Sequence, residues 1–227
     1  GFQSFYGDLW AKGETEKLRK SFESLVWTIH TSVVFVFGCV AVLIVPFVKV
    51  YTFGVNDADY DVPLFALLIT LAYAAYCIRL PYNLMVLAGN HYKQTQKSYI
   101  IATALNIVVS VITVKIYGLI GVATGTLISM LYQTVWMAYY NDKNLVQWPF
   151  KEFVKQTFVD IISFVPPYMI CLMYSLNSYS YAMWVILAIK VAVTWIVWIV
   201  LVNFLFYRSK LSAILGRLTK KKIVLNK

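Results

Sequence analysis

Six long apolar runs separated by short polar segments constrain the fold of this chain more than any other feature of its sequence. The runs cover about residues 26–50, 64–88, 98–116, 119–140, 158–174 and 181–206. A helix needs about 20 apolar residues to cross a hydrocarbon core of about 30 Å, and each run approaches or exceeds that length. The sequence therefore predicts an all-α integral membrane protein, a polytopic bundle of six transmembrane helices.

Composition argues against a soluble enzyme. Hydrophobic residues make up 60% of the chain and charged residues 13%, whereas soluble domains average about 45–50% and about 25%. The formal net charge of +10 resides mostly in the segments between the apolar runs. We interpret this excess as a consequence of membrane topology and of attraction to anionic membrane lipids, so that it requires no nucleic-acid partner.

The basic residues also predict how the chain is oriented. Sixteen of the 20 Lys and Arg residues lie in segments that would share one side of the membrane, and the other side would hold only Lys49 and Lys115. Because positively charged loops stay in the cytoplasm, we expect both termini of this chain to be cytoplasmic. The acidic loop with Asp57, Asp59 and Asp61 then lies outside.

Polar segments divide the chain into five parts. We expect a cytoplasmic amphipathic segment (1–25), four membrane helices (26–140), a cytoplasmic linker (141–157), two additional membrane helices (158–206) and a basic cytoplasmic tail (207–227). The first residue is Gly rather than Met, and no secretory signal opens the chain, which leads us to expect a part of a longer protein.

Polar side chains inside the apolar runs recur at helical spacing, which places them on one face of each helix. These stripes contain Tyr73, Tyr76, Arg79 and Asn83; Thr103, Asn106, Ser110 and Thr113; Thr126, Ser129, Gln133, Trp136 and Tyr140; and Lys190, Thr194 and Trp198. A single stripe can be explained by interhelical hydrogen bonds alone. Four stripes in six runs favour a shared polar cavity, with Arg79, Tyr76, Asn83, Asn106, Ser110, Gln133 and Lys190 as candidate substrate-binding residues.

Arg79 and Lys190 are the two cations within the apolar runs that lie far from a run end. Each side chain can extend toward the membrane surface, or it can bind an anion inside the bundle. A guanidinium can hold a phosphate through two parallel hydrogen bonds, whereas an ammonium acts as a point charge. Both interpretations stay open at this stage.

Gly121, Gly125 and Ser129 form a row of small residues, which predicts close packing of two helices. No phosphate-binding glycine motif is present, and we expect no ATP hydrolysis. Cysteines and histidines lack the spacing of a metal or catalytic site. We therefore predict no cofactor, no metal and no catalytic residues, and we expect Asp160 to pair with a neighbouring Lys.

The order of several segments resembles a known transporter family. These segments are SFYGDLWAKGETEKLRKSF, VPFVKVYTFGVNDADYDVPLFALL, YCIRLPYNLMVLAGNHYKQTQ and LNIVVSVITVKIYGLIGVATGTLISMLYQTVW. They resemble the second half of the bacterial polysaccharide biosynthesis proteins, the Wzx-type oligosaccharide repeat-unit flippases of the multidrug/oligosaccharidyl-lipid/polysaccharide exporter superfamily. The resemblance covers about residues 1–140, and the last two runs match only in topology.

The resemblance implies that residues 26–140 belong to the second lobe of a two-lobe flippase, followed by two extra helices. It implies alternating access, in which a polyprenyl-pyrophosphate-linked oligosaccharide crosses the bacterial cytoplasmic membrane for capsule or O-antigen export. Such a transporter would lie in membrane lipids. Its further partners would be a glycan polymerase and assembly proteins.

Three alternatives stay open. A cation-coupled multidrug exporter of the same superfamily would carry a buried carboxylate, and in these runs only Asp160 qualifies. A membrane enzyme of glycan assembly would need a catalytic constellation, which the short external loops do not supply. A membrane scaffold would use the basic tail and the aromatic linker as docking surfaces.

Overall fold

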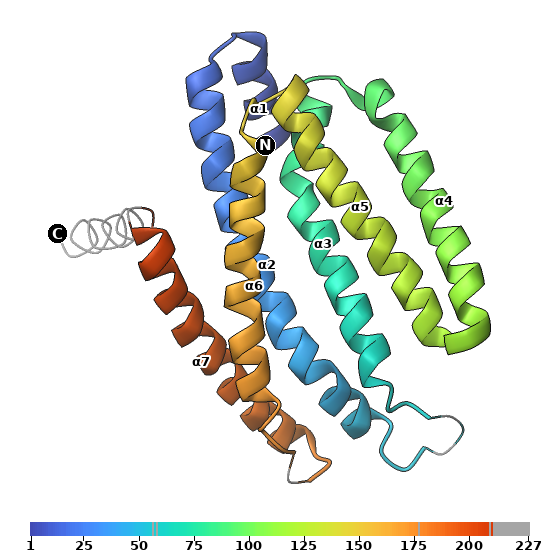
Figure 1. Ribbon diagram of the computed structural model, residues 1–227. Helices are drawn as coiled ribbons and strands as arrows, with labels where there is room; N and C mark the ends of the chain where they lie inside the picture. The colour runs from blue at the N-terminus through green and yellow to red at the C-terminus, as the bar shows by residue number, and fades with distance from the viewer. Residues whose placement is uncertain (56, 58, 177, 209, 211–227) are drawn as a thin grey trace, which may run out of the picture.

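The computed structural model describes residues 1–55, 57, 59–176, 178–208 and 210. Within them the chain forms seven helices (Figure 1): α1 (Phe2–Ala11), α2 (Thr15–Tyr51), α3 (Pro63–Ala88), α4 (Tyr92–Tyr117), α5 (Leu119–Asn144), α6 (Phe150–Cys171) and α7 (Tyr181–Phe206). The prediction of an all-α fold is confirmed. The basic tail predicted for 207–227 lies outside the described residues at 209 and 211–227.

Five helices are long and apolar enough to cross a membrane, namely α2, α3, α4, α5 and α7. The predicted fifth span forms helix α6 but is not among these five. Lys155, Gln156 and Asp160 lie within α6 and lower its hydropathy. The prediction of a helical membrane protein is therefore confirmed, whereas its count of six spanning helices is one higher than length and composition support.

The linker predicted for 141–157 is mostly helical. Helix α5 continues to Asn144 and α6 begins at Phe150. Pro149, whose fixed φ suits the start of a helix, directly precedes α6. Glu152 lies in the first turn of α6, where a negative charge interacts favourably with the helix dipole. Polarity marked this segment as a linker, but these local signals start a helix.

Helix α2 joins two groups of helices. It contacts α1 and α3 on one side and α6 and α7 on the other (Figure 1). Helix α5 packs along both α3 and α4, while α3 and α4 barely touch each other. In the described part of the chain α7 contacts only α2 and α6. This arrangement leaves a groove between α3 and α4 with α5 as its floor.

Two buried clusters hold these groups together. One cluster joins α1, α2, α3, α5 and, through Phe153, α6, and it contains the aromatic rings of Tyr6, Phe22, Tyr82 and Trp148. The other joins α2, α6 and α7 around Trp195, which is fully buried. The Trp195 ring lies against the backbone of α2 at Gly38, where an added Cβ would overlap the ring. Glycine is therefore required at position 38 for this close approach.

Candidate functional site

A polar groove of about 430 Å³ lies between α3, α4 and α5. Arg79 reaches it from α3, and Gln133 and Ser129 reach it from α5. Helix α4 supplies Tyr99 and Asn106. Hydroxyl, amide and guanidinium groups thus converge on one groove from three helices, and this groove is the candidate substrate site.

Arg79 is a buried cation with few partners. Arg79 is only 5% exposed. The guanidinium lies over the Tyr76 ring at 5.1 Å from the centroid, and Nη2 donates to Met130 Sδ at 3.8 Å. Its Nε has no hydrogen-bond partner among the described residues, and no acidic group there forms an ion pair with it. A buried guanidinium with unused donors facing a groove is suited to binding an anion.

Amide and hydroxyl groups continue the polar surface away from Arg79. Gln133 is buried, and its Nε2 donates to Ser98 Oγ at 3.0 Å. The Oε1 atom of Gln133 is buried and has no hydrogen-bond partner within the described chain. Ser110 Oγ donates to Asn106 Oδ1 at 3.1 Å. This side of the groove offers groups that can hydrogen-bond sugar hydroxyls.

The structure brings most of the sequence-predicted cavity residues together. Arg79, Asn106 and Gln133 line the groove. Tyr76 contacts the Arg79 guanidinium, and Ser110 holds Asn106 as described above. Asn83 accepts a hydrogen bond from the Tyr99 hydroxyl at 3.2 Å. Tyr99 itself was missed, although it lies one turn before Thr103 on the same face of α4, so helical spacing could have indicated it.

Lys190 does not join this group. It is exposed on α7, which makes no contact with α3, α4 or α5 in the described part of the chain. The other polar residues of its stripe form bonds within the α6 and α7 region. Trp198 Nε1 donates to the Ile162 carbonyl at 3.0 Å, and Thr194 Oγ1 pairs with the Tyr174 hydroxyl at 2.9 Å. The expectation that all four stripes share one cavity therefore fails for α7.

The row of small residues lies where α4 and α5 meet. A Cβ added at Gly121 would overlap the α4 backbone at Thr113, and one added at Gly125 would overlap Ser110 Oγ. Thr113 Oγ1 donates to the Gly121 carbonyl at 2.8 Å across this contact. Ser129, the third residue of the row, is buried and lines the groove. The two helices therefore approach each other closely along this row.

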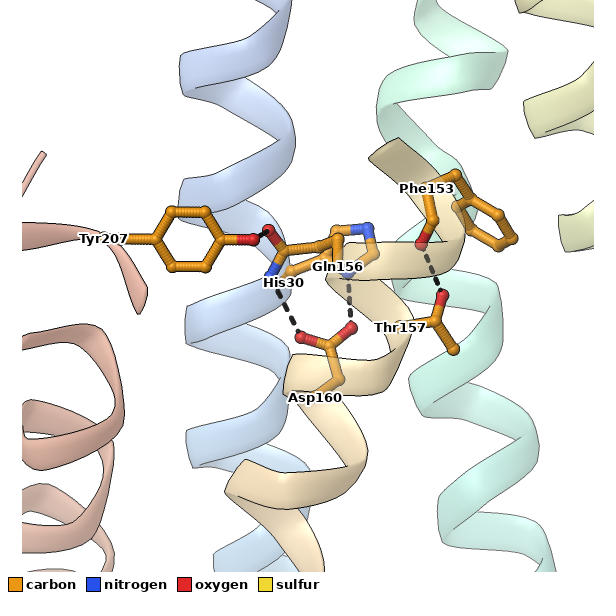
Figure 2. A network of polar contacts seen from close by, with 6 residues as sticks. All are labelled: His30, Phe153, Gln156, Thr157, Asp160 and Tyr207. Carbon is orange, nitrogen blue, oxygen red and sulfur yellow. Dashed lines mark hydrogen bonds and ion pairs between the residues drawn. The ribbon is translucent and has the colours of Figure 1, made fainter. Parts of the chain in front are cut away.

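A second polar cluster joins α2, α6 and the end of α7 (Figure 2). His30 Nδ1 lies 2.5 Å from Asp160 Oδ2, and Gln156 Nε2 donates to Asp160 Oδ1 at 3.2 Å. The Tyr207 hydroxyl donates to Gln156 Oε1 at 2.6 Å. The expectation that Asp160 pairs with a neighbouring Lys is wrong. Its partner is 130 positions away, so no spacing in the sequence could indicate it.

Tyr207 serves this cluster as a neutral donor. Burial raises the pKa of the Tyr207 hydroxyl to about 12, and the negative charge of Asp160 adds to this effect. The phenol therefore keeps its proton at neutral pH and can donate it to Gln156. His30 Nδ1 and Gln156 Nε2 both contact the Asp160 carboxylate, and Tyr207 donates to Gln156, as Figure 2 shows.

Comparison with known proteins identifies no relative. No protein-family model, no curated protein and no solved structure matches the chain significantly. The functional argument therefore depends on the residues and the geometry described above.

Proposed function

We propose that this chain is part of a membrane transporter that flips polyprenyl-pyrophosphate-linked oligosaccharide repeat units across the bacterial cytoplasmic membrane for capsule or O-antigen export. The single observation that carries this proposal is the Arg79 guanidinium, buried without an anionic partner beside a polar groove. A pyrophosphate supplies the missing acceptors, because its oxygens can take two parallel hydrogen bonds from one guanidinium.

The remaining groove residues fit the other parts of such a substrate. Sugar hydroxyls can bond Asn106 and the hydroxyl of Tyr99. The slight contact between α3 and α4 gives the groove a side opening. A polyprenyl chain can then remain in the bilayer while its polar head occupies the groove. Transport of this kind needs no covalent step, so the proposed protein is not an enzyme.

The proposal includes the orientation and the surroundings of the chain. Both of its termini would be cytoplasmic, as the basic segments predict. Membrane lipids would surround the helices, and a glycan polymerase and assembly proteins would receive the product on the outer side. The groove is one wall of the transport path, with the opposite wall supplied by another lobe.

A second candidate is a cation-coupled multidrug exporter of the same superfamily. The observation that favours it is the buried carboxylate of Asp160, which is 9% exposed and forms no ion pair with a described Lys. Such an exporter requires a carboxylate that exchanges a cation inside the bundle. An apolar cationic drug would not need Arg79, so the two candidates make opposite predictions for that residue.

The test replaces Arg79 with Ala and with Lys in the protein expressed in its host. Membrane levels are matched, and the delivery of lipid-linked oligosaccharide to the outer leaflet is measured. We expect Arg79→Ala to lower delivery at least tenfold and Arg79→Lys to restore part of it. Arg208→Ala is the matched control, since Arg208 is exposed beside Phe204 outside the groove. Normal delivery by Arg79→Ala would overturn the proposal, and unchanged or improved drug export would favour the second candidate.

A further inference from the structure

Helix α7 carries a lysine on the face that points away from the bundle. Lys190 is exposed and shares one row of α7 with the exposed side chains of Ile186, Val193 and Val197, at spacings of four, three and four residues. The opposite face packs around Trp195 against α2 and α6, the two helices that α7 contacts in the described part of the chain. Because α7 forms one edge of the bundle (Figure 1), the Lys190 row faces its surroundings.

The depth of Lys190 in the membrane keeps its charge away from water. Helix α7 has 26 residues and begins and ends at aromatic residues, Tyr181 and Phe206, which suit the two membrane interfaces. With α7 centred in a hydrocarbon core of about 30 Å, the Lys190 backbone lies about 10 Å from the nearer edge. A lysine side chain of five bonds extends about 6 Å, so the ammonium group stays inside the hydrocarbon. An unpaired charge is strongly disfavoured there.

The described part of the chain offers Lys190 no counter-charge. Its ammonium group forms no ion pair and no cation–π contact with a described residue. Thr194, one turn further along α7, has other partners, since its hydroxyl donates to the Lys190 carbonyl and pairs with the Tyr174 hydroxyl, both at 2.9 Å. The Lys190 ammonium therefore requires an acidic group from outside the described bundle.

A second copy of the chain does not supply that acidic group. Among the ten acidic residues of the sequence, Asp160 alone lies within an apolar run. Its carboxylate is buried in the bundle and contacts His30 and Gln156. Two copies that met at their α7 faces would instead bring two Lys190 side chains together. The carboxylate that pairs with Lys190 must come from a different protein.

The α7 face is also distant from the groove that contains Arg79. Helix α4, which lines the groove, lies at the opposite edge of the bundle from α7 (Figure 1). Helix α7 makes no contact with α3, α4 or α5 in the described residues. A lobe that covers the groove would therefore leave the α7 face open to another membrane protein.

We propose that the Lys190 face of α7 binds a transmembrane helix of a second membrane protein, and that this helix carries one Asp or Glu near its middle. The carboxylate accepts a charge-assisted hydrogen bond from the Lys190 ammonium, which is stronger in hydrocarbon than in water. Ile186, Val193 and Val197 pack against the apolar side chains of the partner helix. A helix without the carboxylate leaves the ammonium unpaired, so the charge provides specificity. This inference goes beyond the proposed transport function and does not depend on it.

The test uses synthetic transmembrane helices of Leu and Ala that differ only in the central residue, which is Glu, Gln or Leu. Energy transfer from the labelled full chain to each labelled peptide measures binding in vesicles of phosphatidylcholine. We expect the Glu peptide to bind at least tenfold more tightly than the other two. Lys190→Leu should remove this preference, and Lys190→Glu should transfer it to a peptide with a central Lys. Lys115→Leu is the matched control, because Lys115 is also exposed but lies in the last turn of α4.

Equal binding of the Glu, Gln and Leu peptides would overturn the proposal, and so would the absence of binding by all of them. A preference for Glu that persists in Lys190→Leu would overturn it as well, because another group would then hold the carboxylate. Lys190 is exposed, so its substitutions leave the buried clusters of α7 intact. The assay contains no transported lipid and does not involve the groove. Its result and that of the Arg79 experiment are therefore independent.

Discussion

His30 Nδ1 lies 2.5 Å from the Asp160 carboxylate, and this contact joins α2 to α6 across 130 positions of sequence. Both residues are buried, so neither can replace the other's contact with water. The contact is thus one of the few polar links between the α6 and α7 pair and the rest of the helices.

Removal of either partner should destabilise the fold. We expect His30→Ala and Asp160→Asn each to lower the free energy of unfolding by about 3–5 kcal/mol, because each change leaves a buried polar group unpaired. The double substitution should cost less than the sum of the two single ones. Denaturant unfolding in matched micelles measures these differences. The control is Asp61→Asn, which breaks the exposed Lys49–Asp61 pair and should cost about 0–1 kcal/mol. Additive single effects would contradict a direct His30–Asp160 interaction.

Gly125→Ala should separate α4 from α5. The added Cβ would overlap Ser110 Oγ, and it would also lie 2.9 Å from the Ser110 backbone nitrogen, so the helices must move apart. We expect a loss of about 1–3 kcal/mol in stability from this overpacking. The matched change Gly7→Ala places its Cβ 3.8 Å from the Ala88 carbonyl oxygen, which is an ordinary contact. Thermal unfolding of both variants provides the comparison, and equal midpoints would refute the close approach.

Lys190→Ala should leave transport unchanged. Lys190 is exposed on α7 and lies in a different group of helices from the groove. Oligosaccharide delivery by this variant should therefore equal that of the unmodified protein, while Arg79→Ala reduces delivery. If Lys190→Ala also abolishes delivery at normal membrane abundance, the substrate path must include the α7 face.

Tyr207 should make stability depend on alkaline pH. Its pKa in the folded protein is about 12, raised by burial, whereas a Tyr in an unfolded chain has a pKa of about 10. The folded state therefore retains the proton more strongly, and this stabilisation is complete below pH of about 10 and is lost as the pH rises toward about 12. Unfolding midpoints at increasing pH should fall less in Tyr207→Phe than in the unmodified protein. Parallel curves for the two proteins would show that Tyr207 does not contribute.

The helices could be predicted from the sequence because they depend on local composition. Apolar runs of sufficient length located every helix that can cross a membrane. The helical spacing of Arg79, Asn106 and Gln133 placed each on a polar face, and α3, α4 and α5 then packed with those faces toward one groove. The glycines of α5 indicated a close contact with another helix for the same reason, since their spacing keeps them on one helix face, whereas the identity of that helix, α4, comes from the structure.

The remaining features depend on contacts between distant segments. No periodicity links His30 to Asp160, whose proximity results only from the packing of α6 against α2. Lys190 lies in a stripe with the same helical spacing as the stripes that line the groove. Because α7 packs only against α2 and α6 in the described part of the chain, Lys190 lies away from the groove. Residues 150–157 were assigned to the linker because of their polar composition, although Pro149 and Glu152 favour the first turn of a helix.

The sharing of α2 between two groups of helices has a consequence for cooperativity. Helix α7 contacts only α2 and α6 within the described chain, while α3, α4 and α5 are held by their own contacts and by α2. The two groups can therefore open with different free energies, as separate cooperative units rather than in one transition. Hydrogen exchange would then report two protection classes, and α2 would keep the slower rate because it belongs to both.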